Sequence, residues 1–270
     1  MIQVPILTVI VLVLNDNPHA EVVGQSKHAD LNNGERFVEC PGGVLLSSSI
    51  CIPYGYRKGE LPKIPLEIHA AIEVENIREI DDKKMTVSLE FHPQFVWSDD
   101  RIVTNFTDYE KKKGKVMNNI NIEKLWKPDL LIENLCEFKL HSVLGDVSGL
   151  FIGNGLVLGL KNETIVWYEF SAKASIYCNF DFFRYPMDKQ ECNFTIGTTY
   201  PSKRTVIFTY HSSVFRFGKD TQSTDDFNIN ILTIDPDLYN FTRFGFTIKM
   251  NRAYNLLFCN ATFHVSRLSL

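Results

Sequence analysis

The amino-acid sequence predicts an all-β protein whose main part is an antiparallel β-sandwich of about ten strands. Apolar and polar residues alternate with a period of two in several segments, and no long segment shows the 3.6-residue period of an amphipathic helix. Gly, Pro, Asn and Asp separate the alternating segments, as expected of turns. A content of 22% charged and 44% hydrophobic residues is typical of a globular chain rather than a disordered one.

The first 60 residues show no such alternation. An apolar run from Val4 to Leu14 is too short to span a bilayer and predicts a secretory signal peptide over residues 1–20, although no Lys or Arg precedes it. Residues 21–60 are rich in Gly, Asn and Ser and predict an irregular N-terminal arm, with a possible short helix near Lys27 to Leu31.

The predicted strands begin at Leu66. In the first segment the even-numbered residues are apolar, and in the second the odd-numbered ones are, which predicts one buried and one exposed face for each. The segments with this pattern are Leu66 to Glu75, Met85 to Trp97, Thr164 to Cys178, Thr205 to Tyr210, Phe227 to Thr233 and Phe244 to Met250.

Charge and motifs exclude several function classes. A net charge of -4 argues against nucleic-acid binding, which needs a basic face, and the basic run Lys111 to Lys113 is expected in a solvated loop. The sequence contains no nucleophile elbow, no zinc-protease helix and no phosphate-binding loop. Spacings typical of metal ligands are absent as well, so we expect no enzyme, no metal and no cofactor.

Cysteines and sequons point to an oxidising, extracellular compartment. The chain has six cysteines, and five Asn-x-Thr sequons are predicted glycosylation sites, at Asn105, Asn162, Asn193, Asn240 and Asn260. Cys40 and Cys51 are expected to pair, because Pro41-Gly42-Gly43 begins a short loop between them. For Cys136 and Cys259, a buried or unpaired thiol and a bridge remain equally open.

Three motifs follow one another along the strands. Trp97-x-Asp99-x-Arg101 ends the second predicted strand, and Trp126-x-Pro128-Asp129 opens a later one. A Trp buries a large area at a sheet corner, and an Asp beside an Arg can fix a turn by a charge-assisted hydrogen bond.

The third motif is a segment from Cys178 to Cys192, in which two cysteines enclose thirteen residues. Tyr185-Pro186-Met187-Asp188 forms a turn signal within it. Five apolar residues in this short segment would be costly to leave in water and predict a partner surface; they are Phe180, Phe182, Phe183, Tyr185 and Met187.

The order and spacing of the three motifs resemble the extracellular ligand-binding domain of the Cys-loop family of pentameric ligand-gated ion channels. The resemblance covers the chain from about Tyr56 to Tyr254 and implies a ligand-binding β-sandwich over residues 61–255. It also implies a Cys178–Cys192 disulfide and assembly into a homo- or hetero-pentamer. A small-molecule ligand would bind between neighbouring subunits.

The resemblance implies positions for the ligand-binding residues, which are His92, Glu133, Thr199, Tyr200 and Tyr239. Three positions that are often aromatic in the family carry His92, Glu133 and Thr199 instead, which disfavours a nicotinic ligand. Glu133 is expected to pair with an ammonium group, and His92 to make the site sensitive to pH. The alternatives without a ligand-binding role are that Glu133 is solvated at an interface and that Thr199 is a strand residue that contacts no ligand.

The resemblance also implies a coupling region that meets a membrane domain, comprising Asp82, Tyr185, Pro186, Asp188 and Arg252. Residues 256–270 depart from the family pattern, because a first membrane helix is expected there and the segment contains a sequon and charged residues instead. We therefore expect either the ligand-binding domain of a channel, whose full-length form carries the membrane domain, or a secreted transmitter-binding protein of the same fold.

Overall fold

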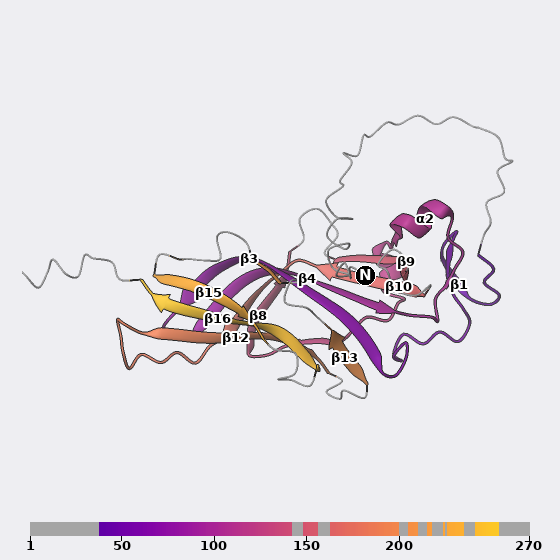
Figure 1. Cartoon of the computed structure of the whole chain (residues 1–270). Coiled ribbons are helices and arrows are strands. Elements are labelled where there is room, and N and C mark those ends of the chain that lie inside the picture. The colour runs from indigo at the N-terminus through magenta and orange to yellow at the C-terminus, as the bar shows by residue number, and fades with distance from the viewer. Residues whose placement is uncertain are drawn as a thin grey trace, which may run out of the picture.

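The computed structural model describes residues 38–141, 148–155, 163–199, 205–209, 215–217, 224, 226–234 and 241–253 (Figure 1). Within these ranges the chain forms sixteen strands, β1 to β16, and two short helices, α2 and α3. The all-β prediction is therefore confirmed, with more strands than the ten or so expected, because several strands of two to four residues were not foreseen. The predicted signal peptide, the helix near residues 27–31 and the tail 256–270 lie outside the described residues.

The larger sheet has nine strands, and β3, β4 and β10 form its centre. Beyond these, β11 continues beside β4 and also pairs with β8. The strands are β3 (Leu66–Asp81), β4 (Thr86–Ser98), β6 (Lys115–Val116), β8 (Leu135–Leu140), β9 (Ser148–Asn154), β10 (Thr164–Phe170), β11 (Ala172–Tyr177), β13 (Val206–Thr209) and β14 (Phe215–Phe217).

The alternation predicted for β3 and β4 is confirmed by burial. On β3 the apolar residues Leu66, Ile68, Ala70, Ile72 and Val74 are all buried, while Glu67, Glu73 and Glu75 are exposed. On β4, Val87, Leu89, Phe91, Phe95 and Trp97 are buried in the same way. One face of the sheet therefore forms the core wall.

The smaller sheet has four strands in the order β15-β16-β12-β7. They are β7 (Leu130–Ile132), β12 (Lys189–Thr198), β15 (Phe227–Thr233) and β16 (Arg243–Arg252). Gly245 is required where β16 pairs with β12 opposite Thr195, because an added Cβ would lie 2.9 Å from the Cα of Thr195 and closer still to the carbonyl oxygen of Phe194. The two strands thus pack more closely than a side chain would allow.

Aromatic side chains fill the space between the two sheets. The Phe91 ring on β4 meets Phe194 on β12 edge-on at 5.0 Å, and Phe95 meets Phe244 on β16 at 5.8 Å. These contacts join strands of both sheets into one core, which is the sandwich arrangement that the sequence predicts (Figure 1).

The segment predicted to be an irregular arm contains a hairpin. β1 (Val44–Ser47) pairs with β2 (Ile50–Ile52), and β2 also pairs with β5 (Val103–Thr104) in a three-stranded sheet. The predicted Cys40–Cys51 disulfide is present, with its Cα atoms 6.0 Å apart. Strands of two to four residues give too short an alternation to be recognised in a Gly- and Ser-rich sequence.

The basic run predicted to be a loop belongs to helix α2 (Asp108–Lys113). Its N-cap Thr107 and Glu110 form a reciprocal capping box, and acidic and basic residues occupy its first and last turns. No residue of α2 is buried, so the helix has no apolar stripe by which to predict it. The second helix is α3 (Asn119–Ile122), and no helix within the described ranges is long and apolar enough to cross a membrane.

One feature departs from a purely antiparallel sandwich. β13 and β14 both pair with β3 in parallel, Val206 opposite Leu66 and Phe215 opposite Ile72. The two short strands thus run along the free edge of β3, which shields part of that edge from pairing with another chain.

Candidate functional site

The two tryptophan motifs pack against each other at one corner of the sandwich. The indole rings of Trp97 and Trp126 meet edge-on at 5.4 Å, and both residues are buried. Arg101 binds Asp99 through both carboxylate oxygens at 2.8 Å, as the motif predicts. The same guanidinium donates to the carbonyl oxygens of Arg57 and Glu60, so the motif ties the incoming chain to the end of β4.

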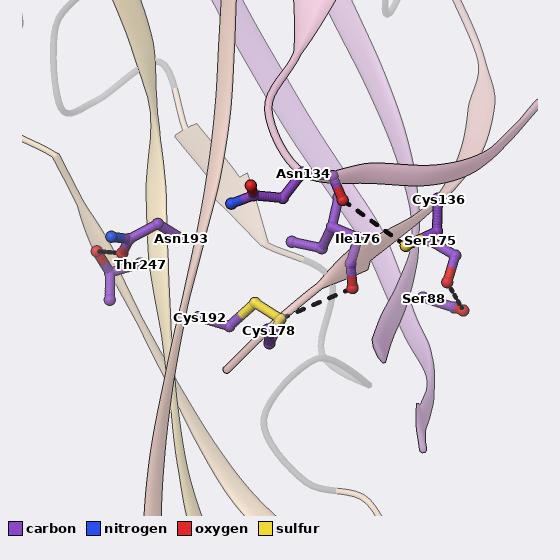
Figure 2. The surroundings of a disulfide bond; sticks show 9 residues. All are labelled: Ser88, Asn134, Cys136, Ser175, Ile176, Cys178, Cys192, Asn193 and Thr247. Atoms are coloured by element: carbon purple, nitrogen blue, oxygen red, sulfur yellow. Dashed lines mark hydrogen bonds between the residues drawn. A yellow bond between two sulfur atoms is a disulfide. The ribbon is translucent and has the colours of Figure 1, made fainter. Parts of the chain in front are cut away.

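The predicted Cys178–Cys192 disulfide closes the loop between β11 and β12 (Figure 2). The loop's apolar residues divide into two groups. Phe180 is buried and Phe182 packs on the core, whereas Phe183 is 91% exposed. Tyr185 and Met187 are exposed as well, at 63% and 66%. Three of the five apolar residues therefore form an exposed tip that a partner could cover, whereas Phe180 and Phe182 are covered by the domain itself.

Cys136 carries an exposed free thiol on β8. Of the alternatives that the sequence left open for this residue, the unpaired thiol is therefore correct and the bridge is not. Its Sγ lies 3.8 Å from the carbonyl oxygen of Asn134 (Figure 2). That oxygen also accepts a hydrogen bond from the Tyr177 backbone N–H. Cys259 lies outside the described residues.

Arg252, at the end of β16, joins three separate segments. Its Nε lies 2.7 Å from Oδ1 of Asp188 in the disulfide loop, and a terminal nitrogen lies 2.9 Å from the other oxygen. The same nitrogen lies 2.9 Å from Asp82 in the turn between β3 and β4. The structure thus brings together the three charged residues predicted for coupling.

The surroundings of this cluster favour its charged form. The Asp188 side chain is 1% exposed and that of Arg252 is 11% exposed, and Gln190 donates a further hydrogen bond of 2.6 Å to Asp188. The hydrogen bond from Arg252 lowers the pKa of the Asp188 carboxyl, against the effect of burial, and the two carboxylates raise the pKa of Arg252. The guanidinium also lies 4.4 Å from the Phe227 ring centroid and 5.0 Å from that of Tyr185.

Glu133, predicted to meet a ligand, follows β7 and is held from two sides. Arg243 at the start of β16 forms an ion pair with it, and Thr195 Oγ1 donates a hydrogen bond of 2.6 Å. Gly197 lies between them on β12, opposite Arg243, where an added Cβ would come within 3.1 Å of the Arg243 side chain. The missing side chain therefore leaves room for Arg243 beside β12.

His92 lies on the other sheet, on the outward face of β4. Its Nδ1 is 2.9 Å from the Ser171 hydroxyl, which lies between β10 and β11, and its Nε2 is 3.6 Å from the Glu169 carboxylate. The side chain is 23% exposed. His92 and Glu133 thus belong to different sheets, and the structure does not bring them together within one chain.

The remaining predicted residues lie mostly at the margins of the described part. Thr199 is exposed just after β12, and its N–H donates to the Asp129 carbonyl oxygen at 3.2 Å. Tyr200 and Tyr239 lie outside the described residues, as do the sequons at Asn162, Asn240 and Asn260. Asn105 and Asn193 are exposed, and Asn193 accepts a hydrogen bond from Thr247 (Figure 2).

Three residues near these sites were not predicted from the sequence: Arg243, Gln190 and Phe227. Arg243 and Phe227 depend on strand register, since Gly197 is opposite Arg243 and Phe227 is opposite Arg252. Gln190 alone had a local signal, because it follows Asp188 at the spacing that places two strand residues on one face. Within the described ranges no three His, Cys, Asp or Glu residues are arranged to hold a metal ion.

Comparison with known proteins yields one family. The model of the neurotransmitter-gated ion-channel ligand-binding domain matches residues 51–254. The bovine gamma-aminobutyric acid receptor subunit pi is 28% identical over 141 residues, which is 51% of this chain and 29% of that subunit.

Two human proteins are similar over longer stretches at a lower sequence identity. The gamma-aminobutyric acid receptor subunit rho-1 is 22% identical over 165 residues, 61% of this chain and 31% of that subunit. The 5-hydroxytryptamine receptor 3E is 22% identical over 193 residues, 72% of this chain and 38% of that receptor. The matched stretch is thus about a third of each relative's length.

These relatives are receptor subunits and not enzymes. The family match covers the sandwich, both tryptophan motifs and the disulfide loop. The chain therefore belongs to the family of neurotransmitter-gated ion-channel ligand-binding domains.

Proposed function

We propose that the chain is the extracellular ligand-binding domain of a subunit of a pentameric ligand-gated channel, and that ligand binding reaches the pore through the Cys178–Cys192 loop. The observation that carries this proposal is the cluster around Arg252. One guanidinium bridges the loop, the β3–β4 turn and the last strand of the sandwich. A movement of any one segment changes the geometry of the other two.

The exposed tip of the loop supports a channel rather than a secreted binding protein. Phe183, Tyr185 and Met187 project from a segment whose base is held by the disulfide and by Asp188. Three large exposed apolar side chains on one loop are typical of a contact surface. In the proposed assembly that surface meets the membrane domain, on the extracellular side of the plasma membrane.

The ligand, in this proposal, is a small amino acid that binds between subunits. Glu133 offers a carboxylate for an ammonium group, and Arg243 beside it offers a guanidinium for a carboxylate. Both side chains keep access to solvent, with exposures of 27% and 42%. The relatives named as gamma-aminobutyric acid receptor subunits agree with this chemistry, and His92 of the neighbouring subunit would form the opposite wall.

The proposal is tested by calorimetric titration of the secreted, glycosylated chain with gamma-aminobutyric acid and, for comparison, with 5-hydroxytryptamine. Glu133→Gln should weaken binding by about tenfold, because an ion pair to a partly buried carboxylate is lost. Glu191→Gln is the matched control, since Glu191 also pairs with a basic residue of β16, Lys249, and is exposed. Equal affinities of the two variants would contradict this ligand site.

Assembly is tested separately by light scattering during size-exclusion chromatography. A mass five times that of the chain supports the pentamer. A monomer that binds the amino acid as tightly as the pentamer does would refute the inter-subunit site.

A further inference from the structure

A cavity of about 660 Å³ opens within the single chain, between the Trp126-Lys127-Pro128-Asp129 corner and strands β8 and β10. Its volume is in the range of small-molecule sites. Neither Glu133 nor His92 lines it, so it is distinct from the ligand site proposed above.

The walls of this cavity are aromatic. The Tyr168 and Phe170 rings lie 5.6 Å apart, and Phe138 meets Phe170 edge-on at 6.4 Å. Phe138 and Leu140, which also lines the cavity, are 39% and 47% exposed on β8, where large apolar side chains would ordinarily be covered. A flat apolar ligand would bury this surface.

The rim of the cavity places two ammonium groups around one carboxylate. Lys127 Nζ lies 3.4 Å from one oxygen of Glu123, and Lys58 Nζ lies 3.6 Å from the other. Lys127 Nζ is also 5.6 Å from the Tyr168 ring centroid, which joins the charged rim to the aromatic wall. The fields of Lys127 and Lys58 lower the pKa of Glu123, as two cations beside one carboxylate should.

We propose that this cavity is a second, intrasubunit site for small planar aromatic carboxylates. The ring of the ligand packs between Phe138 and Tyr168, and its carboxylate replaces that of Glu123 between Lys58 and Lys127. Glu123 can be displaced at little cost, because its side chain is 70% exposed and exposed ion pairs contribute little. A cationic ligand of the same shape would be repelled by both lysines.

The test uses saturation-transfer NMR and calorimetry on the intact chain with three probes of one shape: 2-naphthoate, the neutral 2-naphthamide and the cationic 2-naphthylmethylammonium. We expect naphthoate to bind about fivefold more tightly than the amide, a ratio set by the modest strength of partly exposed charge pairs, and the cation to bind most weakly. Equal binding of the anion and the cation, or no saturation transfer to naphthoate, would overturn the proposal.

Variants assign the binding to this cavity. Lys127→Gln should remove the preference for the anion, and Glu123→Gln should tighten naphthoate binding, because a competing carboxylate is gone. Phe138→Ala should abolish binding of all three probes, and its thermal midpoint reports whether the fold is intact. Glu133→Gln should leave naphthoate binding unchanged, which separates this proposal from the inter-subunit site. Unchanged naphthoate affinity in folded Phe138→Ala protein would place any binding elsewhere.

Discussion

Replacing Arg252 by Met should destabilise the domain more than replacing any exposed arginine. The methionine keeps an apolar stem over Phe227 but leaves the Asp188 carboxylate, which is 1% exposed, without its cation. Removing one partner of a buried ion pair costs about 3–5 kcal/mol of unfolding free energy. Because Arg252 is 11% exposed and Asp82 33% exposed, we expect about 3 kcal/mol, the lower end of that range.

The loss should be measured as a shift in the thermal or urea unfolding midpoint of the secreted chain. For a domain of this size, 3 kcal/mol corresponds to a decrease of roughly 6–12 °C. Arg57→Met is the control, since Arg57 is 73% exposed and its ion pair among the described residues is with the exposed Glu60. Its effect should be below about 0.5 kcal/mol.

The pH dependence gives a second measurement of the same cluster. Arg252 lowers the pKa of Asp188, so its stabilisation is present above the ordinary carboxyl pKa and is lost as the pH falls through the folded value. The difference between wild type and Arg252→Met should therefore shrink below about pH 4. If Arg252→Met were as stable as Arg57→Met at pH 7, the ion pairs of Arg252 would not stabilise the domain.

Three further predictions concern other parts of the sandwich. Hydrogen bonds to Glu110 outweigh its burial and lower its pKa to about 2. Between pH 4.5 and pH 2 the wild type should therefore lose about 1–2 kcal/mol more unfolding free energy than Glu110→Gln. Acid unfolding followed by circular dichroism measures this difference. Opening the disulfide by Cys178→Ser with Cys192→Ser should cost about 3 kcal/mol in urea unfolding and reduce secretion, and normal secretion of pentamers would contradict the proposed role of the loop. Gly197→Val should displace Arg243 without removing a charge and weaken amino-acid binding in the calorimetric titration, while Gly59→Val, at a position with open space, should not.

The sequence predicts the long strands well and the short elements poorly, for a physical reason. β3 and β4 each bury one face over ten or more residues, so the period of two is unmistakable in Leu66 to Glu75 and Met85 to Trp97. β1 and β2 are four and three residues long, and α2 has no buried residue. Such elements are held by pairing and capping, which leave little trace in a hydrophobic pattern.

The residues of the candidate site were also predicted only in part. The resemblance to the Cys-loop family implies Asp82, Asp188 and Arg252 as coupling residues, and the structure places them in contact. The Arg243 partner of Glu133 was not foreseen, because it depends on the register of β7, β12 and β16. Sequence reasoning finds residues at fixed offsets from a motif, whereas a contact across three strands needs the sheet itself.

Strand β16 carries an ion-paired arginine at each end. Arg243 binds Glu133 at the candidate ligand site, and Arg252 binds the disulfide loop at the other end. Nine residue steps at a rise of about 3.4 Å separate them by roughly 30 Å. Because β12 and β15 hydrogen-bond β16 on both sides, the strand resists bending and stretching. The strand should therefore move as a rigid unit, so that a small displacement of Arg243 along the strand axis would also displace Arg252.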